Sequence, residues 1–254
     1  MVPKIIFREM TLEENINIIK WEYFEKEGPM NIHSLIIRYF PELSKIDQKL
    51  SKEEVNDIIE NMIIEKHNKM IHKIRQDIEK YNDIWSKYND KYFETLSTYL
   101  NIKWPNKHKI IYAEVGITPV FPRYLDSFRF SLGVGLPEEI LIRISAHETL
   151  HFLWFHKWKE LYPECPRREY DSPFITWEYS EMVTDPILNS KEIKEILKID
   201  EKAYNSFYEV KDGNNYMMDE LKKIYDSKLN IEEKIIKGFE YIKSVISNHK
   251  RKNR

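Results

Sequence analysis

The segment from Ile140 to Trp158 constrains the fold most, because it contains neither glycine nor proline and is apolar on nearly every side. Pro137, followed by two glutamates, is typical of the first turn of a helix, where proline is tolerated and acidic side chains meet the positive end of the helix dipole. A helix that is apolar all round is normally buried in a core. We therefore expect a long, buried helix that begins near Pro137 and continues to Trp158.

Three ionisable side chains interrupt the apolar character in the middle of this segment: His147, Glu148 and His151. A helix advances about 100° per residue, so the two histidines leave the same face roughly 6 Å apart and can share one tetrahedral zinc ion. Glu148 would then lie beside the ion, where it could accept a proton from a metal-bound water. A chance match is the alternative, but unpartnered polar groups in a buried helix would cost several kcal/mol.

A third protein ligand is needed, and two nearby positions do not supply it. Six residues after His151, where the metzincin pattern has a histidine, this chain has Lys157. His156 lies nine residues after His147, which is about 180° around a helix, so it would face away from the site.

A second apolar segment that carries acidic residues extends from Asp171 to Asp185. The sequence Asp171-Ser172-Pro173 would supply the N-cap of a helix and then proline as its first helical residue. Glu178, Glu181 and Asp185 are spaced by three and four residues, so they fall on one stripe of that helix. The apolar residues around the stripe favour an inward-facing position; the alternative is a solvated acidic edge.

Together, His147-Glu148-x-x-His151 and Glu181-x-x-x-Asp185 resemble the gluzincin, or thermolysin-like, zinc metallopeptidases over roughly residues 108–188. The resemblance implies a peptidase that acts on a peptide or protein with Zn²⁺ as its cofactor. In it, Glu148 would be the catalytic base and Glu181 the third zinc ligand. Asp185 would hydrogen-bond a ligand histidine and fix its tautomer.

Two features separate the possible assignments within the second segment. Glu178 is the alternative ligand, but the residue four positions after it is Met182, whereas Asp185 follows Glu181 at that spacing. Pro186 follows Asp185 directly and disfavours helical geometry there. Family members also use a downstream tyrosine or histidine to stabilise the transition state. The tyrosines at plausible distances here are Tyr204, Tyr208 and Tyr216, and the sequence does not rank them.

Strand patterns precede the motif helix. Residues 127–135 alternate as in a half-buried strand, at the place where the family has an edge strand that pairs with extended substrate. An ordinary edge strand that ends in a glycine turn is an equal alternative. Further strands are expected at residues 109–115 and 5–8.

The rest of the chain is helical by pattern. Apolar residues recur every three or four positions from Val55 to Tyr92, after a capping-box sequence at Ser51. One helix over this span would exceed about 55 Å, longer than a compact domain of this size normally tolerates. We therefore expect a break near Asn82 or Asn89, with shorter helices at residues 191–197, 216–226 and 231–247. His67 and His72 are expected to be solvated.

These elements predict a mostly helical α+β fold, in which a small antiparallel or mixed sheet packs on the motif helix and on the second ligand-bearing helix. Residues 1–105 would be a mainly helical N-terminal segment, residues 106–190 a zincin-like catalytic core, and residues 191–254 a C-terminal helical segment. At 254 residues and 42% apolar content, the chain can bury a substantial core.

Composition limits the partners. A net charge of -2 gives no indication of nucleic-acid binding, and the chain has no 18-residue apolar run that could enter a membrane. The first ten residues have no hydrophobic signal segment, and Cys165 has no second cysteine with which to form an internal disulfide. We expect a cytoplasmic zinc hydrolase. The alternative is a catalytically silent zincin-like binding or structural protein that acts through its helical surface; the oligomeric state is left open.

Overall fold

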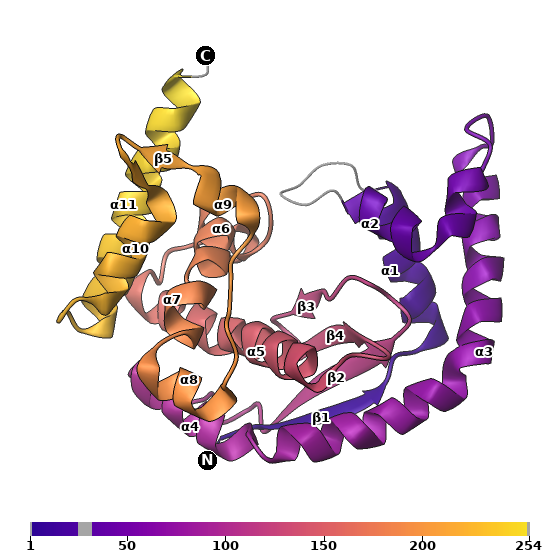
Figure 1. Cartoon of the computed structure of the whole chain (residues 1–254), viewed down its shortest axis with the longest axis horizontal. Coiled ribbons are helices and arrows are strands. Elements are labelled where there is room, and N and C mark those ends of the chain that lie inside the picture. Colours follow the sequence, from indigo (N-terminus) through magenta and orange to yellow (C-terminus); the bar gives the residue numbers. More distant parts are fainter. Residues whose placement is uncertain (1, 25–31, 253–254) are drawn as a thin grey trace. The chain divides into compact units, whose positions relative to one another are not determined.

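The computed structural model describes residues 2–24 and 32–252, with side chains up to residue 247 (Figure 1). Within these ranges helices predominate, and the strands form one mixed four-stranded sheet and one two-stranded antiparallel sheet. The predicted mostly helical α+β class is confirmed. No helix among the described residues combines the length and the apolar composition that crossing a bilayer requires.

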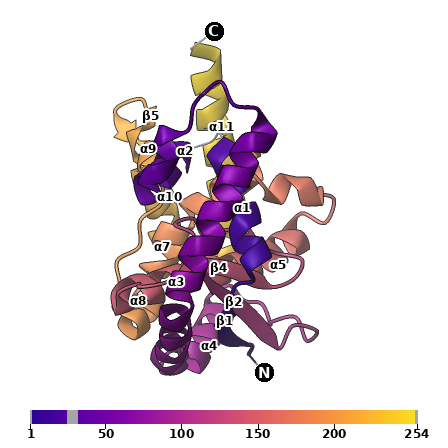
Figure 2. The ribbon, with the colours of Figure 1, turned by 90° about the vertical axis from the view of Figure 1, so that its right-hand side faces the viewer.

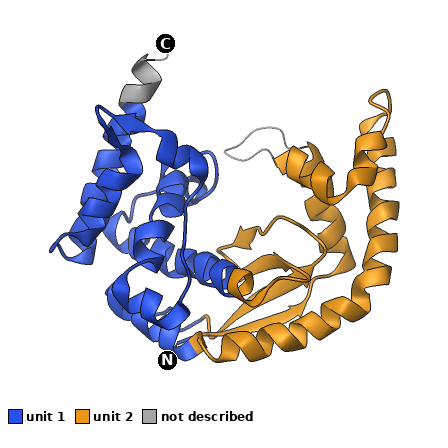
Figure 3. Ribbon diagram, viewed as in Figure 1, with its two compact units in different colours: residues 1–2, 90–107, 142–254 blue, residues 3–89, 108–141 orange. Residues whose placement is uncertain are grey.

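The chain forms two compact units, each discontinuous in sequence (Figure 3). Unit 1 comprises residues 1–2, 90–107 and 142–254, and unit 2 comprises residues 3–89 and 108–141. These boundaries differ from those of the three predicted segments, because strands from both ends of unit 2 pair in one sheet.

The four-stranded sheet belongs to unit 2 and has the order β1-β2-β4-β3. Its strands are β1 (Lys4–Glu9), β2 (Ile110–Gly116), β3 (Arg123–Tyr124) and β4 (Arg129–Gly133). β2 is parallel to β1 and to β4, and β3 is antiparallel to β4. Phe7, Ala113 and Phe130 are consecutive partners across the sheet and are buried, so one face of the sheet contributes to the core.

The strand expected at residues 127–135 is present, but the prediction that it lies at the edge of the sheet is wrong. β4 covers Arg129–Gly133 and lies between β2 and β3, so both of its edges have neighbours. Beyond the short β3, Ser131 N donates to Pro122 O at 2.9 Å. The two-residue β3 gives almost no alternating pattern in the sequence, and this strand is the one that occupies the edge.

Helices make up most of the rest of the described part of unit 2. They are α1 (Leu12–Phe24), α2 (Ile32–Tyr39), the 3-10 helix η1 (Pro41–Lys45) and α3 (Lys52–Ser86). α1 packs beside α3, as Figures 1 and 2 both show, and α3 is the one that packs most extensively on the sheet, against β1. Ser51 forms the predicted capping box with Glu54. On α3, His72 is exposed as expected, but His67 is buried.

The break after α3 falls at Lys87 and Tyr88, next to the second predicted position and not at Asn82. Asn82 lies within the helix, and its side chain forms hydrogen bonds with the backbone of β1 at the edge of the sheet. Its Nδ2 donates to Phe7 O at 3.1 Å, and its Oδ1 accepts from Phe7 N at 3.2 Å. Asn89 Oδ1 likewise accepts from Ile5 N at 3.1 Å. These asparagines complete strand hydrogen bonds that no neighbouring strand makes.

Unit 1 consists mainly of helices. They are α4 (Asn89–Tyr99), α5 (Glu138–Leu161), the 3-10 helix η2 (Arg167–Tyr170), α6 (Ile175–Met182), α7 (Thr184–Leu188), α8 (Lys191–Leu197), α9 (Asn205–Glu209), α10 (Met217–Asp226) and α11 (Ile231–Lys252). A hairpin of β5 (Lys211–Asp212) and β6 (Asn215–Tyr216) lies between α9 and α10. The predicted motif helix and the helix at residues 191–197 are present; α9 and the hairpin were not predicted.

An aromatic cluster anchors α5 within unit 1. Trp154 and Trp158 stack with ring centroids 5.1 Å apart, and Tyr179 of α6 meets both rings edge-on. Phe239 of α11 lies 4.8 Å from Trp158. Aromatic contacts of this kind bury large areas with defined geometry. The cluster therefore fixes the register of α5 against α6, the two helices that carry the predicted site.

The second predicted helix is shorter than expected at one end and interrupted at the other. α6 begins at Ile175 with Phe174 as its N-cap, so the prediction of an N-cap in Asp171-Ser172 and of Pro173 as the first helical residue is wrong. α6 ends at Met182, and Pro186 lies inside the following α7. A proline has no N–H and its ring crowds the carbonyl four residues earlier, which here belongs to Met182.

Candidate metal centre

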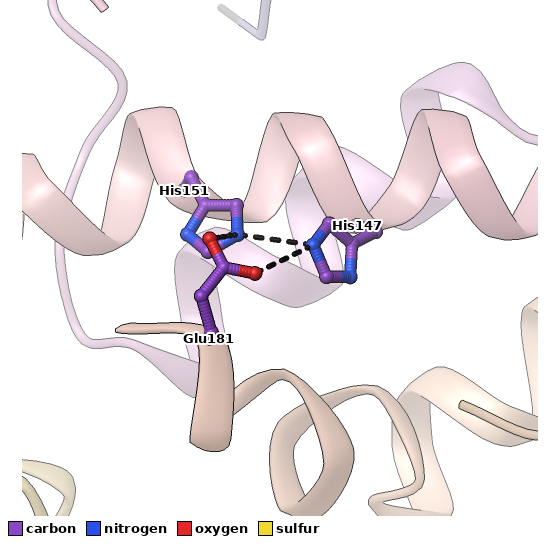
Figure 4. Close-up of side chains that lie close together, drawn as sticks. All are labelled: His147, His151 and Glu181. Atoms are coloured by element: carbon purple, nitrogen blue, oxygen red, sulfur yellow. Dashed lines mark hydrogen bonds and ion pairs between the residues drawn. The ribbon is translucent and has the colours of Figure 1, made fainter. Parts of the chain in front are cut away.

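The site starts from two histidines on one face of α5. The Nε2 atoms of His147 and His151 are 3.2 Å apart, and the ring centroids are 4.9 Å apart (Figure 4). The His151 side chain is completely buried, whereas that of His147 is 19% exposed. The pair therefore lies at the boundary of the core, with access from the side of His147.

Glu181 of α6 reaches the same two nitrogens (Figure 4). Its Oε2 is 3.3 Å from His147 Nε2, and its Oε1 is 3.5 Å from His151 Nε2. Its side chain is buried. The structure thus brings together three of the sequence-predicted residues from two helices, although Glu181 follows His151 by 30 positions in the chain.

The spacing of the two histidine nitrogens fits a tetrahedral zinc ion. Zinc binds imidazole nitrogen at about 2.0–2.1 Å, so two ligands at tetrahedral positions are about 3.3–3.4 Å from each other. The separation of 3.2 Å between the two Nε2 atoms is close to this value. The two Glu181 distances, 3.3 and 3.5 Å, involve different carboxylate oxygens, and one ligand atom from each of the three residues lies within 4.8 Å of the others. Two histidines and one glutamate are also a ligand set of catalytic zinc sites, which leave one position for water.

Among the described residues, three or more histidine, cysteine or acidic donors gather at this place alone. They are His147, His151 and Glu181, with ligand atoms all within 4.8 Å of one another. Glu178, the alternative ligand, is not among them, and its side chain is partly exposed on α6. The geometry therefore favours Glu181 for the third position.

Glu148 follows His147 on α5 and is 8% exposed. Its negative charge contributes to the electrostatics of the neighbouring imidazole. Because the next helical position is about 100° away, Glu148 leaves α5 in a different direction from His147, and it is not one of the three gathered donors.

A carboxylate that sequence reasoning missed contacts the other nitrogen of His147. Glu201 Oε1 is 2.9 Å from His147 Nδ1, and the Glu201 side chain is 1% exposed. Glu201 lies in the connection between α8 and α9, outside any periodic or motif pattern. Nothing in the local sequence distinguishes it from other acidic loop residues, so no sequence signal could have selected it.

Asp185, predicted to orient a ligand histidine, has different neighbours. Its oxygens accept hydrogen bonds from Asn189 Nδ2 at 2.7 Å and from the hydroxyl of Tyr208, and they pair with Lys222 Nζ at 2.8 Å. α6 ends at Met182, four residues before Pro186, so Glu181 and Asp185 do not lie on one regular helix. Asp185 is nevertheless helical, in α7, and the expectation that Pro186 disfavours helical geometry there is wrong. The contact predicted for Asp185 is made by Glu201.

The carboxylates around His147 determine its charge without a metal. Burial alone would lower the pKa of this imidazole, but hydrogen bonds to Glu181 and Glu201, with the charges of Glu201 and Glu148, raise the pKa well above its usual value. A cation is therefore strongly favoured at this position, whether it is a proton or a metal ion.

The three candidate tyrosines are in different surroundings. The Tyr208 hydroxyl donates to Asp185 and accepts from Ala203 N at 3.1 Å, so it is engaged within the fold. The Tyr216 side chain is 44% exposed on the hairpin. Tyr204 packs against Trp177 with ring centroids 6.2 Å apart.

Comparison of the chain with protein-family models, with curated proteins and with solved structures gave no match.

Proposed function

We propose that this protein is a zinc-dependent hydrolase, and more specifically a metallopeptidase. The observation that carries the proposal is the convergence of His147, His151 and Glu181, whose ligand atoms lie within 4.8 Å of one another, with Glu148 next to His147 in the sequence. A structural zinc site normally has four protein ligands, whereas three ligands leave a position for water. Three ligands together with the carboxylate of Glu148 therefore favour a catalytic site over a structural one.

A zinc ion at this site would lower the pKa of its water and polarise a substrate carbonyl. His147, His151 and Glu181 would hold the ion through two neutral imidazoles and one carboxylate. Glu148 accepts the proton of the attacking water and returns it to the leaving group, the role of a general base that becomes a general acid. The buried surroundings of Glu148 strengthen its electrostatic action at short range.

The substrate class rests on the sequence resemblance. A peptide or protein is proposed because the motif spacing is similar to that of the gluzincin peptidases; an amide or ester of another kind would use the same water chemistry. The cytoplasmic location also remains a prediction from the sequence.

Metal content is the first test. Protein purified without nickel affinity is expected to contain one zinc ion per chain by elemental analysis, and a His151→Ala variant to contain none. A fully folded wild-type protein that contains no metal, and takes up none from zinc solution, would refute the proposal.

Glu148→Gln separates an enzyme from a silent zinc-binding protein. The variant should retain zinc and thermal stability but lose hydrolysis of a peptide library by orders of magnitude, because the amide cannot accept the proton. Glu178→Gln is the matched control on α6 and should leave metal content unchanged. If wild-type protein binds zinc but cleaves no member of the library, the binding or structural alternative gains support.

A further inference from the structure

We propose that Glu201 is the positioning residue of the metal centre, and that Asp185 acts on the same histidine indirectly, by holding the loop that carries Glu201. The inference rests on the proposed zinc site and concerns how His147 is kept ready to bind the ion. The resemblance to the gluzincin pattern predicted that Asp185 alone would orient a ligand histidine. In the proposed arrangement Glu201 contacts His147, and Asp185 acts through the side chains that hold Glu201.

The first step is the contact between Glu201 and His147. An ionised carboxylate can only accept hydrogen bonds, so at 2.9 Å the Nδ1 atom of His147 is the donor. With a zinc ion bound, a proton on Nδ1 would leave the lone pair of Nε2 for the ion, and Nε2 is the atom that faces His151 and Glu181. Glu201 therefore selects the tautomer and ring orientation that zinc binding needs.

The second step is the attachment of Glu201 itself. Asn189, in the turn after α7, binds the backbone of Glu201 on both sides: its Nδ2 donates to Glu201 O at 2.8 Å, and its Oδ1 accepts from Glu201 N at 3.1 Å. The connection between α8 and α9 has no regular secondary structure of its own (Figure 1). This bidentate contact determines where in the connection the carboxylate is presented.

The third step leads to Asp185, which is 2% exposed. It binds Asn189 Nδ2 at 2.7 Å and also accepts from the hydroxyl of Tyr208. That hydroxyl in turn accepts from Ala203 N at 3.1 Å. Asp185 thus holds the loop at two points, at Glu201 through Asn189 and two residues later through Tyr208.

A purely structural role does not explain the Glu201 side chain. The loop is already fixed through the backbone of Glu201, and burying a carboxylate costs free energy that one ion pair seldom recovers. The side chain is 1% exposed, and the guanidinium of Arg143, at 3.9 Å from Oε2, is beyond hydrogen-bond distance. The close contact of the carboxylate is with His147, which indicates that orienting this imidazole is its function.

Zinc affinity of the full-length protein, measured by competition with a chelating indicator, tests the direct role. Glu201→Gln and Glu201→Ala should weaken zinc binding by about 10–100-fold, the usual effect of removing a carboxylate behind a ligand histidine. Asp200→Asn is the matched control, since this neighbouring acid is 80% exposed and pairs with Lys194; it should bind zinc like the wild type.

Nitrogen-15 NMR of the histidine rings gives a readout that loop stability alone would not change. In zinc-loaded wild-type protein His147 should carry its proton on Nδ1, with the shift of a strongly hydrogen-bonded N–H. In Glu201→Ala that hydrogen-bond signature should disappear while the shifts of other folded residues persist.

A double-mutant cycle tests the indirect role of Asp185. Asp185→Asn and the milder Tyr208→Phe should each weaken zinc binding in the wild-type background, but should add little once Glu201 is alanine, because they act through it. Additive losses would show that Asp185 acts independently and would overturn this part of the inference.

The outcomes separate this inference from the proposed function. If the wild type binds zinc and Glu201→Ala binds it equally tightly, the positioning role is wrong while the metal site stands. If the wild type binds no zinc, both fail together.

Discussion

Lys157 occupies the position at which another zinc-peptidase pattern has a histidine, and the structure shows what it does instead. Its side chain is 4% exposed, and its ammonium group contacts Glu232 Oε1 of α11 at 2.5 Å and Asn101 O at 3.2 Å. A buried ammonium needs such partners, because it loses its hydration on folding. This residue therefore links three parts of unit 1 and is no metal ligand.

Glu232→Gln should lower the stability of the protein at neutral pH by about 1–2 kcal/mol, since it removes the charged partner of Lys157. Burial raises the pKa of Glu232, but hydrogen bonds from Lys157 and Asn101 outweigh this and lower the pKa below 4.5. A lowered folded-state pKa stabilises above the unfolded pKa, and that stability is lost as pH falls through the folded value. Denaturation with urea at pH 7 and pH 3 should show the difference between wild type and variant shrinking at low pH. A difference of equal size at both pH values would contradict the ion pair.

The candidate site shows how far single residues can be predicted from sequence. His147, Glu148 and His151 were predictable because one helix fixes their spacing. Glu181 was selected from the acidic stripe of the second segment because Glu181-x-x-x-Asp185 resembles the gluzincin pattern. Glu201 could not be predicted from the sequence, since its contact with His147 joins residues 54 positions apart and depends on the path of an irregular loop.

Helices were predictable where periodicity lasted over several turns, as in α11, and less so where tertiary contacts decided the local structure. The continuation of α3 past Asn82 is an example. Local propensity favours a break at this asparagine, but the hydrogen bonds between its side chain and β1 stabilise the position it has within the helix. The same holds for α6, whose start depends on how the preceding loop packs.

Asn82→Ala tests this explanation at the level of the element. Alanine favours the helix more than asparagine does, so a purely local effect would stabilise α3. Losing the partners of Phe7 N and O should instead destabilise the protein by about 1–3 kcal/mol. Asn68→Ala, at an exposed position of the same helix, is the control and should be neutral or slightly stabilising. Urea denaturation of both variants decides between the two outcomes.

Gly238 gives a second test, on α11. Glycine inside a helix is usually improved by alanine, by about 1 kcal/mol. Here an added Cβ would overlap the Tyr179 hydroxyl and would come within 3.1 Å of Leu221 Cδ1. That hydroxyl donates to Ile235 O at 3.0 Å and cannot move freely.

Gly238→Ala should therefore lower the stability by about 1–3 kcal/mol, the usual cost of overpacking. Adding Tyr179→Phe to this variant removes the overlapping oxygen and should recover part of the loss. If Gly238→Ala is as stable as the wild type or more so, the helices are not packed this closely.

For the whole molecule, the order of elements along the chain conceals which ones form a unit. β1 and β2 are parallel neighbours although about a hundred residues separate them, and α5 begins in unit 2 and continues into unit 1. A periodic pattern identifies a strand but does not identify its partner, so the interleaved units could not be predicted from sequence alone. All the residues of the candidate metal centre belong to unit 1.

Zinc should accordingly stabilise the folded molecule, because three ligands from α5 and α6 converge only in the native state. At about 100 times the dissociation constant, binding adds about 2.7 kcal/mol, so zinc should raise the Tm of wild-type protein in a scanning calorimeter and EDTA should reverse the rise. His151→Ala will have its own, lower Tm because a buried side chain is removed, but the Tm should not depend on zinc. The comparison is thus between the zinc-dependent shifts and not between the absolute values. An equal zinc-dependent shift in Tm in both proteins would mean that zinc binds elsewhere and that His147, His151 and Glu181 are not its ligands.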